Sequence, residues 1–71
     1  MDNGRIVIHL EELLKARGLS KNKFAQRAEL QRTQLNKYIR NEVVLLNIDV
    51  LARMCSVLDC GIDELLEYIE D

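Results

Sequence analysis

Residues 21–40, KNKFAQRAELQRTQLNKYIR, contain two short helical patterns that are separated by a turn. In the first pattern, Phe24 and Ala25 lie at positions that face the interior of a packed domain. In the second, Leu35 and Tyr38 are three residues apart, which is the spacing of an apolar stripe on a helix. Helices that cross at a tight turn need a small residue at their contact, and Ala25 is such a residue. The stretch therefore predicts two short helices packed across a turn.

The residues before this stretch predict an extended segment followed by a further helix. Arg5–His9 is short and rich in β-branched side chains, which favour an extended backbone. Leucines at helical spacing begin at Leu10, and Gly18 is the residue expected just after the end of that helix. Ser20 can cap the next helix, because its hydroxyl accepts a hydrogen bond from an amide of the first turn.

The residues after the stretch predict two more helices. Asn41 can adopt the left-handed conformation at the end of the third helix, and Asn47 can cap the fourth. We expect the inward face of the fourth helix to comprise Ile48, Leu51, Ala52, Cys55 and Leu58. The apolar residues of a fifth helix are expected to be Ile62, Leu65, Leu66 and Ile69. The sequence thus predicts one all-α domain over residues 1–71, a compact bundle of five short helices with a short N-terminal β segment.

Length and composition exclude several classes of function. A chain of 71 residues supports one small core, whereas the larger enzyme folds need roughly 200 residues or more. No apolar run approaches the ~18–20 residues of a membrane span. Cys55 and Cys60 lie five apart and His9 is the single histidine, so we expect no catalytic site, no metal site and no cofactor. Free thiols that serve as small apolar residues suggest a reducing, cytoplasmic location.

Charge is distributed very unevenly along the chain. The net charge is −2, which taken alone argues against a nucleic-acid partner. Residues 15–40, however, contain eight basic residues and one acidic residue, Glu29, for a net charge of +7. Residues 1–14 carry −2 and residues 41–71 carry −7. A basic block of this size can attract a polyanion while the whole protein stays acidic, although a solvated, salt-bridged helix face is the alternative explanation.

The ordered set of residues resembles the phage-repressor (Cro-like, xenobiotic-response-element) helix-turn-helix family of transcription regulators. The resemblance rests on residues 21–40, on the preceding LLKARGLS (13–20) and on VLARMCSVLDCGIDELL (50–66). It covers nearly the whole chain from about residue 8. It implies that the motif at about residues 21–40 binds double-stranded DNA and that its second helix enters the major groove.

The resemblance also implies which side chains contact DNA. The residues that would contact base edges are Arg32, Thr33, Asn36 and Lys37. Arg32 and Lys37 can donate to guanine, Asn36 can pair with an adenine edge, and the Thr33 methyl can meet a thymine methyl. The residues expected to contact the DNA backbone are Ser20, Lys21, Lys23, Gln26, Gln31 and Arg40.

Three positions depart from the family pattern. The turn position that usually holds glycine is Glu29, which is tolerated if its φ is negative and which suggests a different turn. The usual glycine after the second helix is Asn41, a mild change. The usual basic linker is replaced by Glu42–Leu46, which cannot neutralise phosphate and therefore lowers the expected affinity for DNA.

The apolar linker Val43–Leu46 has two interpretations. It can fold beneath the fourth helix, or part of it can stay exposed and form a self-association patch. Residues 5–8 favour the second interpretation, because they are another short β-like segment without an obvious place in a helical bundle. We therefore hypothesise that residues 5–8 and 43–46 pair, within or between chains.

The preferred functional prediction is a sequence-specific DNA-binding transcriptional regulator, a repressor. We expect a homodimer, because one recognition helix covers only a few base pairs. The alternative is a protein-interaction module or antitoxin on the same scaffold, with weak or no DNA binding. A DNA-binding protein should keep the cations of the basic block exposed, whereas an interaction module would tie several of them to the acidic tail. No enzyme, membrane association or small-molecule substrate is expected.

Overall fold

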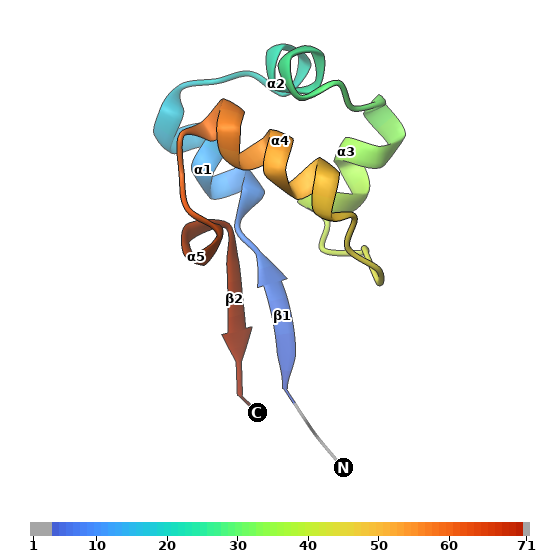
Figure 1. Cartoon of the computed structure of the whole chain (residues 1–71), viewed down its shortest axis with the longest axis vertical. Helices are drawn as coiled ribbons and strands as arrows, with labels where there is room; N and C mark the ends of the chain where they lie inside the picture. The colour runs from blue at the N-terminus through green and yellow to red at the C-terminus, as the bar shows by residue number, and fades with distance from the viewer. Residues whose placement is uncertain (1–3, 71) are drawn as a thin grey trace.

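The computed structural model describes residues 4–70, which form five short helices and a two-stranded antiparallel sheet (Figure 1). The elements are β1 (Arg5–Ile8), α1 (Leu10–Arg17), α2 (Lys21–Ala28), α3 (Arg32–Ile39), α4 (Ile48–Leu58), α5 (Ile62–Leu65) and β2 (Leu66–Ile69). The helices gather at one end, and the two strands project from them as a ribbon. The prediction of a compact, mainly helical fold with an N-terminal β segment is confirmed.

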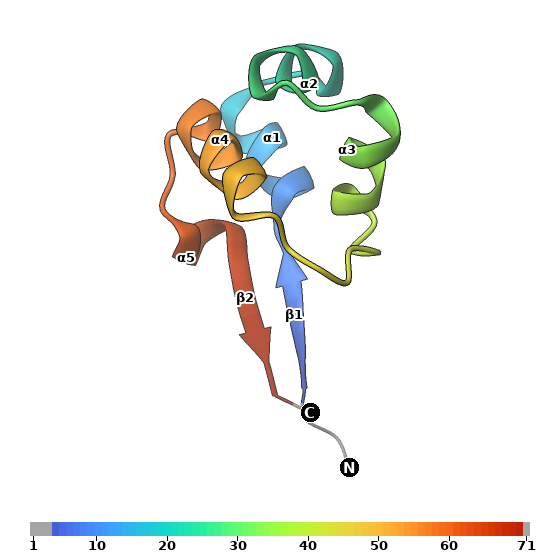
Figure 2. The same cartoon turned by 45° about the vertical axis from the view of Figure 1, so that its right-hand side comes forward.

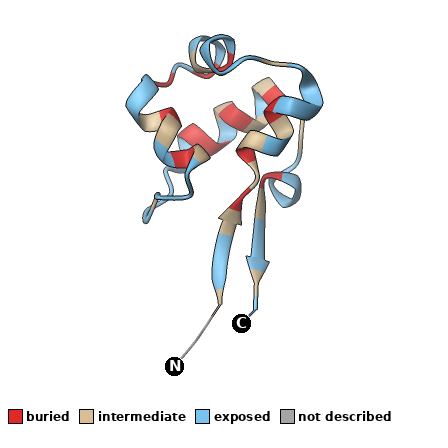
Figure 3. Cartoon of the chain, turned by 180° about the vertical axis from the view of Figure 1, so that it is seen from behind, coloured by how far each residue is buried: buried red, intermediate tan, exposed pale blue. Residues whose placement is uncertain are grey.

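The core lies among the helices and at the end of the ribbon that meets them, as Figure 3 shows. Each helix contributes to it; the largest fully buried side chains are Leu10, Phe24, Leu35, Met54, Leu58 and Leu65. Phe24, Leu35 and Tyr38, which the spacing places inside, are all buried. Ala25 is half-buried and packs against this core. The helix-turn-helix is therefore held by apolar contacts on its inner side, and its outer side is left to solvent.

Most helix ends follow from local sequence. The Ser20 hydroxyl accepts a hydrogen bond of 3.1 Å from the Lys23 amide and caps α2. Asn47 caps α4, because its side-chain oxygen accepts from two amides of the first turn. Gly18 ends α1 with φ 63°, and Asn41 follows α3 with φ 59°, both in the left-handed region. These four predictions are confirmed.

The turn between α2 and α3 differs from the expectation. Glu29 is expected to need a negative φ, but its φ is 57°. Its amide donates to the Gln26 carbonyl at 3.3 Å, and the Leu30 amide donates to the Ala25 carbonyl at 2.9 Å. This is the bonding pattern with which a left-handed residue commonly ends a helix. Glutamate therefore makes the turn that glycine usually makes, and the buried Leu30 side chain anchors it.

The sheet corrects the hypothesis about residues 5–8 and 43–46. β1 pairs with β2 in antiparallel fashion, with Ile8 opposite Leu66. Residues 43–46 form no strand and do not pair with β1 within the chain. The extended N-terminal segment thus finds its partner at the far end of the chain, which no local pattern indicates.

The fifth helix is shorter than predicted. α5 ends at Leu65 instead of continuing to Ile69, and the chain turns directly into β2. The His9 amide donates to the Leu65 carbonyl at 2.7 Å, and the ladder with β1 follows. Leu66 and Tyr68 then lie two residues apart on one face of the strand. The apolar spacing fitted a helix equally well, and the available partner strand decided between them.

The inward face of α4 also differs from the predicted set. Its buried residues are Val50, Leu51, Met54 and Leu58. Ile48 is 83% exposed, Ala52 is exposed and Cys55 is half-buried. Two adjacent stripes of this helix are apolar, so periodicity alone cannot select the one that packs against α2.

Two arginines link neighbouring helices by donating hydrogen bonds to backbone carbonyls. The Arg17 Nε donates to the Leu58 carbonyl at 2.8 Å, and the Arg53 Nε donates to the Ala28 carbonyl at 2.8 Å. Each bond satisfies the carbonyl of a helix's last residue, where a cation also complements the helix dipole. Arg17 therefore has a structural role, although it belongs to the basic block in the sequence.

Candidate nucleic-acid interface

The residues predicted to contact bases share one side of α3. They are Arg32, Thr33, Asn36 and Lys37, at positions i, i+1, i+4 and i+5 of the helix. Asn36 is half-buried and the other three are exposed. The opposite side of α3 is anchored in the core by Leu35 and Tyr38. The fold thus brings all four side chains to one side of a helix whose other side is anchored in the core.

A hydrogen bond joins this surface to α2. The Arg32 Nη1 donates to the Asn22 Oδ1, ten residues earlier in the chain. Asn22 lies in the first turn of α2 and is exposed, so the bond spans the outer side of the motif. It holds the guanidinium of Arg32 against the start of α2. Sequence reasoning missed Asn22, because an exposed asparagine in a first helical turn gives no sign of its partner.

The residues predicted to contact the DNA backbone are all exposed. They are Ser20, Lys21, Lys23, Gln26, Gln31 and Arg40. Ser20, Lys21 and Lys23 lie at the N-terminal end of α2, where helix amides and the helix dipole favour an anion. Gln31 is the N-cap of α3, but its side chain makes no capping hydrogen bond, and Arg40 lies at the other end of that helix.

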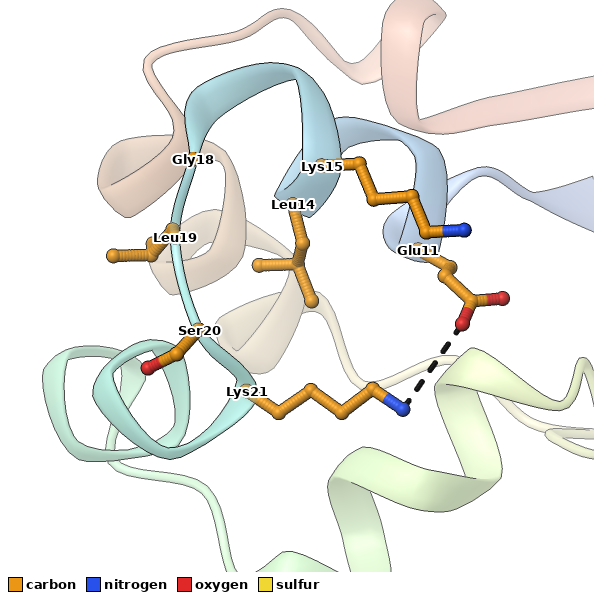
Figure 4. Close-up of a pocket in the computed structure, with 7 residues that line it drawn as sticks. All are labelled: Glu11, Leu14, Lys15, Gly18, Leu19, Ser20 and Lys21. Carbon is orange, nitrogen blue, oxygen red and sulfur yellow. Dashed lines mark ion pairs between the residues drawn. The ribbon is translucent and has the colours of Figure 1, made fainter.

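A hollow beside the start of α2 is lined by residues of α1 and of the α1–α2 turn (Figure 4). The Lys21 and Glu11 side chains point toward one another across it, with Lys21 Nζ 4.0 Å from Glu11 Oε2. Both side chains are close to half exposed, so water screens the ion pair and its contribution is small. Little free energy is therefore needed to release Lys21 from this carboxylate.

The cations of the motif are exposed and largely unpaired. They are Lys21, Lys23, Arg27, Arg32, Lys37 and Arg40. Among residues 4–70, Lys21 is the one member of this set that makes an ion pair, and its partner lies on α1. None of the six pairs with a carboxylate of α5 or β2 within that range. The positive field of the basic block is therefore open to solvent.

Outside the helix-turn-helix, the surroundings of His9 and Cys60 shift the pKa values of these two side chains. The His9 ring contacts Glu12 Oε2 at 2.9 Å and Glu67 Oε1 at 2.7 Å, and these two bonds raise the pKa of His9. Burial, together with the neighbouring Cys55 thiol, raises the pKa of Cys60 to about 11, which keeps this thiol protonated and unreactive.

Residues 4–70 contain no cluster of His, Cys, Asp or Glu that could hold a metal ion. Over the same residues, no helix is long and apolar enough to span a bilayer.

Comparisons with known proteins agree with the geometry. The model of the Cro/C1-type HTH DNA-binding domain family matches residues 9–71. A crystal structure of the transcriptional regulator VanUg aligns with a TM-score of 0.77 over 100% of this chain and 93% of that chain, at 21% sequence identity. No curated protein matches the chain. Because the family match covers most of the sequence and the helix-turn-helix has the expected form, the chain belongs to the Cro/C1-type helix-turn-helix DNA-binding domain family.

Proposed function

We propose that this protein is a sequence-specific transcriptional regulator that places α3 in the major groove of double-stranded DNA. The observation that carries the proposal is the set of six exposed cations on and around α2 and α3, none of which pairs with a carboxylate of α5 or β2 among residues 4–70. A DNA-binding face needs this arrangement, because its affinity comes largely from replacing counterions along the phosphates. An interaction module built on the same charges would be expected to neutralise several of them internally.

Each of the four α3 residues has a distinct proposed role. Arg32 and Lys37 donate to the acceptors of guanine, Asn36 pairs with an adenine edge, and the Thr33 methyl contacts a thymine methyl. Their shared side of α3 and its anchored opposite side support these assignments, since a rigid helix positions side chains reproducibly. Asn22 adds a positioning role, because its hydrogen bond restricts the guanidinium of Arg32.

The backbone contacts define the register of the protein on DNA. Ser20, Lys21 and Lys23 approach one phosphate run at the start of α2, and Gln26 and Gln31 extend the contact toward the turn. Arg40 contacts the backbone at the other end of α3. The linker after α3 offers no cation to a further phosphate, so base contacts supply a larger share of the affinity.

The regulator acts as a cytoplasmic repressor and as a homodimer, without catalytic activity. Occupying the major groove blocks other proteins from the same DNA, which is the simplest regulation that a DNA-binding domain can perform. Two recognition helices related by a two-fold axis double the number of bases contacted, so a homodimer provides the specificity that one short helix lacks.

Selection of bound sequences from a random pool of double-stranded DNA tests this proposal. We expect one enriched half-site repeated at a spacing of about one helical turn or a multiple of it. Affinity for the selected DNA should fall steeply with salt, in proportion to the phosphates neutralised. Lys21→Ala should weaken binding to all sequences alike, because a phosphate contact carries no base information. Recovery of an unenriched pool at low salt would contradict sequence-specific binding.

The alternative function is a protein-interaction module with weak or no DNA binding. The observation that favours it is the exposed apolar linker, since Val44 is 91% and Leu45 is 86% exposed. The same selection separates the two functions, because an interaction module would enrich no sequence.

A further inference from the structure

We propose that a second copy of this chain packs against an apolar surface made by β1 and the α3–α4 linker. This ribbon–linker surface comprises Ile6, Val44, Leu45 and Leu46. The inference deepens the proposed function by locating the dimer interface, and it rests on that function for the requirement of two-fold symmetry. The exposure and the contacts that define this surface do not depend on DNA.

The ribbon–linker surface is continuous and strongly exposed. Val44 and Leu45 protrude almost fully, and Ile6 and Leu46 are 54% and 42% exposed. Ile6, Val44 and Leu46 line one hollow together with Val43, so the strand and the linker share a single apolar surface. Figure 2 shows the linker passing beside the end of β1 that meets the helices. Contiguous exposed apolar side chains of this kind mark interaction sites on small domains.

Asn41 fixes the linker beside the strand. The Ile8 amide donates to Asn41 Oδ1 at 2.5 Å, and Asn41 Nδ2 donates to the Ile8 carbonyl at 3.2 Å. These two bonds occupy the outer edge of β1 at its last residue and hold the chain that follows α3 in place. The surface is therefore preformed, which lowers the entropic cost of covering it.

The ribbon extends the same apolar face beyond the helices. Ile8 and Leu66 face each other at the end that joins the core, and Ile6 and Tyr68 face each other beyond it. Ile8 is buried, whereas Ile6 and Tyr68 are more than half exposed. A two-stranded ribbon is marginally stable in water without a covering layer. A partner on this face would supply that layer.

Charge selects a second copy as the partner. The linker residues 43–46 carry no charge, so the surface offers nothing to a phosphate backbone. Its border, where the linker meets α3, has one cation, Lys37, and one anion, Glu42. A surface with a neutral centre and both signs at its border is compatible with itself across a two-fold axis, because no excess of like charge meets. A strongly charged partner of either sign gains no such match.

The size of the ribbon–linker surface and its position next to α3 are both compatible with a second copy of the chain as partner. A stable interface buries about 800 Å² per partner, which is roughly one sixth of the 5049 Å² surface of this chain. The linker alone is too small for that, but linker and ribbon together extend along the 40 Å axis of the molecule. The linker directly follows α3, so a two-fold axis through it sets two α3 helices on either side of the interface.

A second apolar surface provides the matched control. It lies between α4 and α5 and is lined by Ile48, Leu51, Ala52, Cys55 and Ile62. Ile62 is 50% exposed, which is comparable with Ile6. Ile62→Glu therefore adds the same charge to an exposed apolar side chain outside the ribbon–linker surface.

Sedimentation equilibrium of the full chain without DNA tests the inference, at concentrations between about 1 µM and 1 mM. We expect a monomer–dimer equilibrium for the wild type. Val44→Glu and Leu45→Glu should each raise the dimer dissociation constant by at least about tenfold, because the dimer would desolvate an unpaired carboxylate. Ile62→Glu should leave the dissociation constant unchanged. The exposure of both linker side chains keeps these variants folded, which circular dichroism verifies.

Three outcomes would overturn the interface. The first is a wild type that is monomeric at all concentrations. The second is a change in the dimer dissociation constant that is equal for Ile62→Glu and Val44→Glu. The third is a dissociation constant that changes in Ile62→Glu but in neither linker variant. Binding of each variant to a single DNA half-site separates this inference from the proposed function. Loss of the dimer with half-site binding retained supports the interface, whereas a wild-type dimer that binds no DNA contradicts the proposed function only.

Discussion

At the scale of single residues, the pair formed by Asn22 and Arg32 has the clearest functional consequence. An exposed arginine side chain samples many rotamers, and ordering it on DNA costs conformational entropy. The hydrogen bond to Asn22 restricts these rotamers before binding. A preorganised guanidinium loses less conformational entropy when two of its N–H donors align with the acceptors of guanine. It therefore discriminates better between guanine and other bases.

Substitution of the pair separates base contact from positioning. Arg32→Ala should relax the preference at one base position, at a cost of about 1–3 kcal/mol if the contact with guanine is bidentate. Asn22→Ala should relax the same position by less, and the double variant should bind like Arg32→Ala alone, because Asn22 acts through Arg32. Affinities for the selected DNA and for single-base variants measure this. Additive losses in the double variant would show that Asn22 contacts DNA on its own.

Glu29 is a second residue whose environment conflicts with its type. Its left-handed backbone disfavours any side chain with a Cβ by about 1 kcal/mol. Glu29→Gly should therefore raise the melting temperature by several degrees, since about 1 kcal/mol shifts a domain of this size by roughly 4–8 °C. Glu29→Ala keeps the strain and should bring no such gain. Thermal unfolding followed by circular dichroism distinguishes the two variants.

At the scale of elements, the connection between α3 and β1 depends on one side chain. Asn41 combines a left-handed backbone with two hydrogen bonds to Ile8 that span 33 residues of sequence. Glycine would satisfy the backbone requirement equally well but could not make the bonds. The asparagine therefore joins the end of the recognition helix to the ribbon.

Asn41→Gly tests this joint without disturbing the turn. We expect a loss of about 1–2 kcal/mol in the free energy of unfolding, because a part-buried amide and carbonyl of Ile8 lose their partner. Urea unfolding provides the measurement. An unchanged or increased stability would mean that the left-handed conformation alone explains asparagine at this position. Asn47→Gly, which removes a helix cap of comparable exposure, provides a comparison for the loss of one side chain's hydrogen bonds.

At the scale of the whole molecule, two long-range contacts tie β2 to the N-terminal part of the chain. β2 pairs with β1, and the His9 ring bridges Glu12 on α1 and Glu67 on β2. The bridge favours the charged imidazole, so the pKa of His9 is raised above 6.5, mainly by the bond to Glu12 and then by the bond to Glu67. The same bond to His9 lowers the pKa of Glu12.

The bridge makes stability depend on pH with a defined sign. Because the folded-state pKa of His9 is raised, its stabilisation is complete below pH 6.5 and is lost as the pH rises through the raised value. Urea unfolding at pH values on both sides of 6.5 should show this decline for the wild type and not for His9→Gln. Both carboxylates are more than half exposed, so added salt should reduce the difference. An equal decline in His9→Gln would assign it to another group.

Local sequence was enough to predict the helix-turn-helix, the helix caps at Ser20 and Asn47, the end of α1 at Gly18 and the family. These features depend on residues within a few positions of one another, where spacing and side-chain chemistry act directly on the backbone. Contacts between distant parts of the chain make residues 66–69 a strand, place Asn22 against Arg32 and leave residues 44–46 exposed. The short, mostly apolar segment 66–69 fits a helix or a strand equally well by its spacing. Pairing with β1, which is distant in the sequence, makes it a strand. The base and phosphate contacts follow from the family resemblance together with the residue types, and they stay predictions, because the fold orients these side chains outward without specifying the bases they meet.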